Sequence, residues 1–377
     1  MTFFRDIKKT LQAITANRSI FLTMVLSVVL YSFFYPAAYH AERSDHLPIV
    51  IVDNEHSPLS EHIITSVQRS PNVAIYAVSD DFLSAKSLMQ AGKVEAILYL
   101  PAHLSGSIRR HDASGIGLYV SSAYFLRTQG VMAGLITSLE NTMQEELAPY
   151  LQISHTEPPV LVHKVPLFNP LSGYGSYIFP AVAPLIVHQT ILLGLCMLIA
   201  SYRKAGWRAN GSEFWAIVAT ALMIGCLSCF YLFGFVFWWH HYPRGGNFLG
   251  MLVAVPIFVL AVIGVALLLA SFLDSLERAG QVLIVSSIPL FFLTGVPYPL
   301  PAMPQLVQYI AHLLPSTHGV QALVQLNQMG TPLSVVAGKL LYLMAVAMVC
   351  LALAYLRLKA NPITAKHWQT AKHLSLI

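Results

Sequence analysis

Long apolar stretches without charged residues dominate this chain, and they are separated by short basic segments and one long polar segment. A helix needs about 20 apolar residues to cross the hydrocarbon core of a bilayer. Stretches that meet this requirement predict six transmembrane helices, near residues 20–39, 176–200, 215–239, 248–272, 281–297 and 334–356. The fifth lies in a region that contains no Asp, Glu, Lys or Arg from Ala279 to Gly338.

The amino-acid composition also indicates that most of the chain lies in a lipid bilayer. The 377 residues are 56% hydrophobic and only 10% charged, whereas soluble domains carry about 25% charged residues. Mean hydropathy is +0.62, and 11% of the residues are aromatic. These values argue against an ordinary soluble enzyme and against a disordered chain.

The basic residues predict the orientation of these helices. Twelve of the 22 Lys and Arg residues fall in the amino-terminal tail, in the loop at 203–208, at Arg278 and in the carboxyl tail. The opposite short loops offer Arg244, with Lys339 at a helix edge. Since cytoplasmic loops collect Lys and Arg, both termini are expected in the cytoplasm. The net charge of +5 then needs no nucleic acid partner.

The start of the chain has a second interpretation, because a basic region before an apolar run also describes a signal peptide. Small residues, Ala37 and Ala38, follow the run. The length of the apolar run and of its leader favours an uncleaved anchor. Both interpretations place the following segment outside the cytoplasm.

The segment 41–168 has the composition of a soluble domain, with 8 of the 22 Lys and Arg and 13 of the 17 Asp and Glu. Alternating patterns predict strands at Pro48–Val52, Val73–Val78, Val94–Leu100 and Ile116–Val120, with helices at Ser57–Ser66, Asp80–Gly92 and Tyr124–Leu151. We therefore expect a mixed α/β domain. The predicted domains are 1–40, a cytoplasmic amphipathic helix and the first transmembrane helix; 41–168, the extracytoplasmic domain; 169–357, the remaining helices; and 358–377, a cytoplasmic tail.

Sequence motifs of catalysis are absent, and no catalytic, cofactor or metal site is predicted. No G-x-x-x-x-G-K-[ST], H-E-x-x-H or G-x-S-x-G occurs, so ATP is not expected to bind this chain through a P-loop. The uncharged spans contain no carboxylate for intramembrane chemistry. Cys226 and Cys229 form a C-x-x-C inside an apolar run, where packing is favoured over redox or metal chemistry.

Histidine and glutamine side chains occur in or beside the apolar runs. His188 and Gln189 fall in the middle of the second predicted span, where a polar side chain needs a partner or a water-filled pathway. Contacts between helices are favoured over contact with a transported substrate. His240 and His241 follow Trp238 and Trp239, a pattern typical of a membrane surface.

Helix-breaking residues interrupt the uncharged region after the fifth predicted span. The sequence 294–304 is rich in glycine and proline, and the apolar segment Gln305–Leu314 is too short to cross. A solvated external loop is one interpretation. The lack of charge favours the other, a re-entrant hairpin near 297–318, because a broken backbone is tolerated where it lines a cavity. Candidate gate residues are Gly295, Pro297, Pro299, Pro304, Pro315 and Thr317.

Four segments together resemble the permeases of the ABC-2 export class. They are Pro48–Ser60, Phe168-Asn169-Pro170 with Tyr177-Ile178-Phe179-Pro180, Phe292–Pro297 with Met303-Pro304, and Leu314–Gly319. The resemblance extends over the whole chain. It implies one helix, a large exported domain and five further helices with a re-entrant hairpin, so the expected fold class is an all-α bundle of six helices plus a mixed α/β extracytoplasmic domain.

The resemblance also implies function and partners. Such a permease forms half of an export pathway with a second copy or a paralogue, and separate ATPase subunits bind the ATP, so this chain needs no cofactor. A membrane-fusion adaptor and the lipid bilayer are further expected partners, in a bacterial inner membrane. Family members commonly carry an acidic and basic segment after the second helix, whereas this chain has Arg203, Lys204 and Arg208 without acidic residues.

These three basic residues are the candidate ATPase-coupling loop, and their other interpretation is orientation and headgroup contact. A membrane-anchored sensor or assembly factor is the alternative function, and a membrane-embedded enzyme is disfavoured. Nothing in the sequence identifies the transported substrate.

Overall fold

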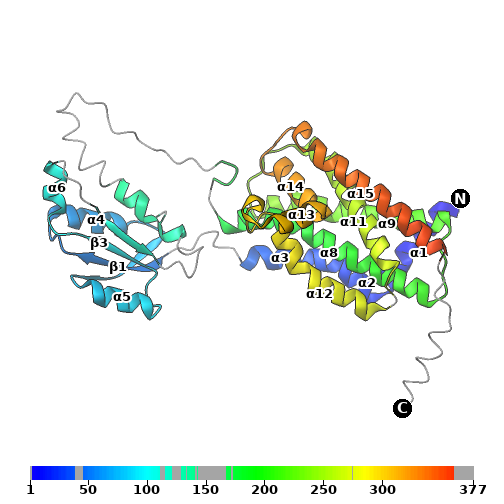
Figure 1. Cartoon of the computed structure of the whole chain (residues 1–377), viewed down its shortest axis with the longest axis horizontal. Coiled ribbons are helices and arrows are strands. Elements are labelled where there is room, and N and C mark those ends of the chain that lie inside the picture. Colours follow the sequence, from blue (N-terminus) through cyan, green and yellow to red (C-terminus); the bar gives the residue numbers. More distant parts are fainter. Residues whose placement is uncertain are drawn as a thin grey trace, which may run out of the picture. The chain divides into compact units, whose positions relative to one another are not determined.

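A computed structural model describes residues 2–38, 46–110, 115–120, 129–132, 134–140, 142, 167–170, 173–273 and 275–360. The chain divides into two compact units (Figure 1). One combines Met1–His40 with Pro166–Ile377 and is called the helical unit here, and the other, Ala41–Val165, is called the sheet unit.

The sheet unit contains a four-stranded mixed sheet in the order β2-β1-β3-β4. Its strands are β1 (Leu47–Asp53), β2 (Val73–Ser79), β3 (Ala96–Leu100) and β4 (Gly117–Val120). β1 lies parallel to both β2 and β3, and β4 lies antiparallel to β3. These are the four predicted strands. The apolar run in β1 is continuous because this central strand is buried on both faces.

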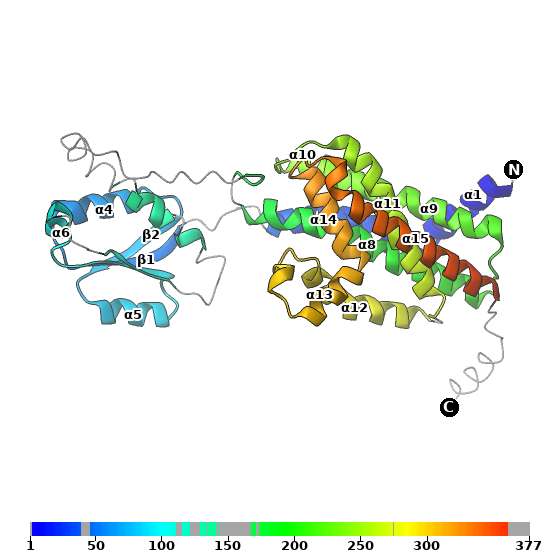
Figure 2. The ribbon, with the colours of Figure 1, turned by 45° about the horizontal axis from the view of Figure 1, so that its top comes forward.

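Helices cover both faces of this sheet (Figure 2). They are α4 (Pro58–Gln68), α5 (Phe82–Gln90) and the short α6 (Leu104–Arg110). Ser57 caps α4 and Asp81 caps α5 through bonds to the first free amides. Only part of the helix predicted from Tyr124 to Leu151 is described, and residues 129–132 and 134–140 are helical there. The rest of that prediction lies outside the described residues.

The helical unit is built from helices joined by short turns. Its elements are α1 (Thr2–Ala16), α2 (Arg18–Phe21), η1 (Leu22–Leu26), α3 (Ser27–Ala38), α8 (Tyr174–Lys204), α9 (Gly211–Phe230), η2 (Tyr231–Val236), α10 (Phe237–Trp239), α11 (Phe248–Ala270), α12 (Leu276–Leu293), η3 (Leu300–Ala302), α13 (Gln305–Leu313), α14 (Pro315–Asn327) and α15 (Leu333–Ala360). The residues beyond Ala360, which include most of the predicted carboxyl tail, lie outside the described part.

Five helical stretches among the described residues are long and apolar enough to cross a membrane. They are Arg18–Ala38, Tyr174–Lys204, Gly211–Trp239, Phe248–Ala270 and Leu333–Lys359. The predicted fifth span, 281–297, corresponds to α12, which ends at Leu293, and its apolar part is the shorter stretch Ile284–Leu293. The six-helix count and the re-entrant hairpin therefore stay predictions.

The core of the helical unit forms around α11, which packs against α8, α9, α14 and α15. The first apolar helix packs on α8 at Gly194, where Met24 lies fully buried. A Cβ atom at position 194 would lie 2.0 Å from the Met24 Cγ, so only glycine permits this approach. Amphipathic α1 packs on α9 through its buried residues Asp6, Thr10 and Ile14.

Candidate functional site

A tight turn follows α12 in the helical unit. The helix ends at Leu293, and Gly295 adopts a φ of 83°, a conformation that favours glycine. Thr294 is fully buried, and its hydroxyl donates to the Phe291 carbonyl at 2.6 Å. A Cβ at position 295 would lie 2.7 Å from the Leu300 Cγ. The chain therefore reverses sharply here rather than continuing as a long helix.

Side chains from α14 hold the end of α12. The Thr317 hydroxyl donates to the Leu293 carbonyl at 3.0 Å, and the Gln321 amide donates to the Thr294 carbonyl at 3.1 Å. The last carbonyls of a helix have no partner within it, so these two bonds satisfy groups that would otherwise stay unpaired in an apolar setting. Sequence reasoning proposed Gly295 and Thr317, and the structure brings them to the same turn. It missed Gln321, whose role depends on the fold.

The same turn is also bound to α8. The Tyr177 hydroxyl donates to the Val296 carbonyl. Ala181, Leu185 and Val320 form a small apolar cluster against Phe291 and Val296, so α8, α12 and α14 meet directly below the turn. We call this arrangement the clamped turn, residues 293–297 with Tyr177, Thr317 and Gln321.

The remaining candidate gate residues are prolines around short helices. Pro297 is partly buried, whereas Pro299 and Pro304 are exposed. Pro304 precedes α13, and Pro315 is the buried first residue of α14, a position for which proline is well suited. Pro299, Pro304 and Pro315 therefore stand at helix starts rather than inside one continuous helix. Figure 1 shows α12, α13 and α14 as separate neighbouring helices.

Two polar side chains in the middle of α8 have buried polar atoms. His188 is 3% exposed, and its Nδ1 has no hydrogen-bond partner among the described residues. Neither polar atom of the Gln189 amide has a partner there either. Gln189 follows Ala181 and Leu185 at helical spacing, so it lies on the stripe that faces α12 and α14. Buried polar atoms without partners are costly, and they are expected to gain a partner in another state or assembly.

The three basic residues of the candidate coupling loop have different surroundings. The Arg203 guanidinium donates to the carbonyls of Ala270, Ser271 and Leu273 at 3.3, 2.9 and 3.1 Å, so it caps the carboxyl end of α11. Lys204 and Arg208 are exposed. Arg203 thus has a structural role that the sequence did not reveal, because its acceptors lie far along the chain.

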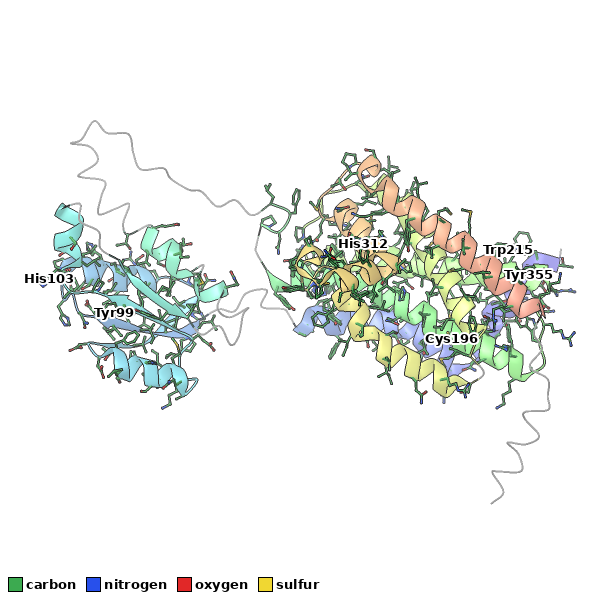
Figure 3. The ribbon with its side chains drawn as sticks, viewed as in Figure 1. Tyr99, His103, Cys196, Trp215, His312 and Tyr355 are labelled. Atoms are coloured by element: carbon green, nitrogen blue, oxygen red, sulfur yellow. The ribbon has the colours of Figure 1, made fainter. Side chains whose placement is uncertain are left out.

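Polar contacts connect the elements around this loop with α1 and α15. The Ser212 hydroxyl at the start of α9 donates to Asp6 in α1 at 2.6 Å, and the Trp207 indole donates to Glu213 at 2.8 Å. Arg357 at the end of α15 donates to the Ser271 hydroxyl at 3.2 Å. Figure 3 shows Trp215 and Tyr355 at this end of the helical unit and His312 toward the other.

The sheet unit contains a polar cavity of about 350 Å³ where β1 and β3 end. It is lined by Asn54, Glu55, Ser57, Ala102, His103, Ser105 and Gly106. The carboxyl ends of parallel strands are where ligands bind in many α/β folds. Figure 3 places His103 at this edge.

The Glu55 side chain lines this cavity and binds the start of α6. Its carboxylate accepts the amides of Leu104 and Ser105 at 2.5 and 2.9 Å and the Ser105 hydroxyl at 2.5 Å. Burial opposes ionisation of Glu55, but the hydrogen bonds from Ser105, Leu104 and Ser57 outweigh it, so the pKa of Glu55 lies below its ordinary value.

Five helical stretches in the described part of the chain, long and apolar enough to cross a membrane, define the class, that of integral membrane proteins. The sequence profile described as ABC-2 family transporter protein matches residues 18–356, so the chain belongs to that family. The resemblance inferred from the sequence motifs is therefore confirmed.

Curated relatives include the "Probable multidrug ABC transporter permease YbhS" of Escherichia coli (strain K12). It is 21% identical to this chain over 300 residues, which cover 75% of this chain and 77% of the relative. The protein of the same name from Escherichia coli O157:H7 matches equally. Such relatives are membrane subunits of transporters and not enzymes, and the chain is a transport protein of the membrane.

Proposed function

We propose that this chain is the permease subunit of an ATP-driven exporter in a bacterial inner membrane. It forms half of a membrane pathway with a second copy or a paralogue, and a separate ABC ATPase binds and hydrolyses the ATP. The observation that carries the proposal is the match of residues 18–356 to the ABC-2 transporter family. The clamped turn, which is bound to α8 and α14, is the proposed gate.

In this proposal six segments enter the membrane, with both termini in the cytoplasm. α12 enters as a short helix, and η3 and α13 return as the re-entrant part. The end of the helical unit that holds Arg203, Arg208 and Arg357 faces the cytoplasm, in agreement with the distribution of Lys and Arg. The sheet unit then lies outside, where a membrane-fusion adaptor is a proposed partner.

The pathway is proposed to run along α8 and α12. The orphaned amide of Gln189 and the His188 imidazole supply polar groups on an otherwise apolar wall. Such a wall suits amphipathic organic molecules, whose apolar bodies need little hydrogen bonding. The name of the relative, a multidrug permease, supports this substrate class for the present chain.

The proposed ATPase contact lies at the opposite end, on α1 and the loop before α9. Lys204 and Arg208 are exposed there, whereas Arg203 is bound to α11. Because this loop lacks the acidic residues of other family members, we propose that a paralogous permease supplies the stronger contact in a heterodimer.

The test is purification of the tagged chain from its native membrane. We expect an ABC ATPase to co-purify, ATP hydrolysis by the complex and none by the isolated chain. In inverted membrane vesicles, the complex should accumulate a fluorescent amphipathic dye when ATP is added. ATP hydrolysis by the isolated chain, or a chain that purifies without any ATPase, would contradict the proposal.

A second function, partner or ligand binding by the sheet unit of an anchored sensor, is favoured by the cavity at the ends of β1 and β3. Deletion of an associated ATPase discriminates between the two functions. A sensor would keep its response without the ATPase, whereas a permease would lose all dye accumulation.

A further inference from the structure

Three helices of the helical unit bring polar and titratable side chains together in a region that is otherwise uncharged. His312 comes from α13, His318 and Gln325 from α14, and Lys339 and Tyr342 from α15. We call these five residues the α13–α15 polar cluster. None of the functional roles described above uses them.

Antiparallel packing of α14 and α15 aligns the members of the cluster. The Lys339 ammonium donates to the Gln325 amide oxygen at 2.8 Å. Further along, the rings of His318 and Tyr342 lie 4.4 Å apart between centroids, and the Tyr342 hydroxyl donates to the Leu313 carbonyl at 2.9 Å. The cluster is therefore an ordered set of side chains rather than a group of independent surface residues.

The charge of Lys339 has no counter-charge in the described part of the chain. Its hydrogen-bond acceptor is a neutral amide, and the ion pairs found among the described residues do not include it. No carboxylate occurs in the sequence between Ala279 and Gly338. A partly buried ammonium in an apolar stretch is stabilised by an anion, and the residues that the structure describes offer none.

His318 adds a second group that awaits a partner. Its Nε2 lies 2.8 Å from the His312 carbonyl, which can only accept, so this nitrogen carries the proton. The other ring nitrogen, Nδ1, is then a bare acceptor, and it is buried without a partner among the described residues. The Tyr342 ring packs against the imidazole at an interplanar angle of 43° and holds it in this orientation. A P–OH group can donate to Nδ1, and a protonated Nδ1 can donate to an anionic oxygen.

We propose that the α13–α15 polar cluster binds a phosphate group, with Lys339 as the cation and His318 as the hydrogen-bonding partner. An ammonium and an imidazole on neighbouring helices match the charge and the several oxygens of phosphate. Lys339 lies six residues after the start of α15, about 9 Å along its axis. In the membrane orientation proposed above, the headgroup of a lipid reaches this depth. Two sources share this chemistry, an anionic phospholipid and a soluble phosphate compound.

The experiment measures binding to the purified full-length chain in detergent. Fluorescently labelled phosphatidylglycerol is the probe, and unlabelled phosphatidylglycerol, dioleoylglycerol and inorganic phosphate are competitors. Lys339→Gln should weaken probe binding by about tenfold or more, because a hydrogen bond to a charged group is lost together with the charge. Lys339→Arg should retain most of the affinity. Lys359→Gln is the matched control, since it removes a lysine from the other end of the same helix.

The competitors identify the source of the phosphate. Competition by phosphatidylglycerol alone indicates a lipid headgroup, and equal competition by inorganic phosphate indicates a soluble ligand. Competition by dioleoylglycerol, which has no phosphate, would overturn the proposal. So would equal probe affinities of the unsubstituted chain and Lys339→Gln, or an equal loss in Lys359→Gln.

A second variant keeps the test decisive if Lys339→Gln does not fold. His318→Gln leaves the ammonium in place and should weaken binding by several-fold, and unchanged affinity there contradicts the site. No ATPase takes part in the measurement. Failure of this proposal therefore leaves the transport function untouched, and failure of the transport function leaves this binding test valid.

Discussion

Single hydrogen bonds satisfy the carbonyl groups at the end of α12. Thr317→Val keeps the shape of the side chain but leaves the Leu293 carbonyl without its donor. We expect the free energy of unfolding to fall by about 1 kcal/mol, with a larger fractional loss of transport because the turn is no longer clamped. Dye accumulation in vesicles and the thermal midpoint in detergent measure the two effects.

Thr317→Ser is the control for this change, since it retains the hydroxyl. Transport by the serine variant should stay close to that of the unsubstituted chain. If valine and serine variants transport equally well, the bond to Leu293 has no part in gating.

Glu55 gives the sheet unit a dependence on pH. Its folded-state pKa lies below the ordinary value of 4.5, so the carboxylate stabilises the fold at neutral pH. This stabilisation is fully present above the unfolded pKa and is lost as pH falls through the folded pKa. We expect the α6 amides of the full chain to keep their hydrogen-exchange protection at neutral pH and to lose it only as the pH falls below the ordinary Glu pKa of 4.5.

Glu55→Gln should show weaker protection of these amides already at neutral pH, since a neutral amide replaces the carboxylate at the helix start. Its protection should then change little on acidification. If the unsubstituted chain and Glu55→Gln lose amide protection at the same low pH, a titratable group other than Glu55 causes the loss.

At the scale of elements, the sheet unit was the more predictable part. Its strands are short apolar runs that end in turn residues such as Asp53 and Ser79, and helix starts carry capping residues such as Ser57 and Asp81. These signals depend on neighbouring residues only, so they can be recognised in a single sequence. The short α6 was missed because its start is held by Glu55, 49 residues earlier.

The helical unit was predictable in its long spans and less so in its broken region. Apolar length alone located the spans around α8, α9 and α11. The boundary of α12 was not predicted, because the helix ends at Leu293, where Thr317 and Gln321 satisfy its carbonyls. The role of Gln321 depends on contacts across 27 residues, which a single sequence does not reveal.

Arg203 supports the end of α11, whereas Arg208 is exposed. Arg203→Gln should lower the free energy of unfolding by about 1.5–3 kcal/mol, because three carbonyls at the end of α11 lose a charged donor. Arg208→Gln should leave stability unchanged, since the side chain is exposed. Thermal midpoints of the purified chain, with and without the ATPase, provide the comparison.

The coupling proposal concerns the second of these residues. Arg208→Gln, combined with Lys204→Gln, should reduce ATPase stimulation by the permease while the thermal midpoint stays constant. Full stimulation in this double variant would leave orientation and headgroup contact as the role of the loop.

At the scale of the whole molecule, the helical unit has two chemically different ends. The basic residues Arg203, Arg208 and Arg357 gather at one end with α1, and the clamped turn lies toward the other. In Figure 3 the labels of Tyr355 and His312 mark these two ends. An unequal distribution of basic residues sets the orientation of a protein in a membrane. The membrane topology of the chain therefore tests the proposed orientation of the helical unit.

Single cysteines in a chain without Cys196, Cys226, Cys229 and Cys350 test that topology. In intact cells, a membrane-impermeant thiol reagent should label Lys86→Cys in the sheet unit, whereas Arg208→Cys should react only after the membrane is opened.

The same reagent tests α13, in which Leu306, Tyr309 and Leu313 are exposed apolar residues. Single cysteines at these positions should be protected if the helix is re-entrant, because lipid or a partner copy then covers them. A solvated loop predicts rapid labelling at all three positions instead. Labelling that changes when ATP is supplied to the complex would place α13 in the moving gate, and labelling of Arg208→Cys in intact cells would reverse the proposed orientation of the entire chain.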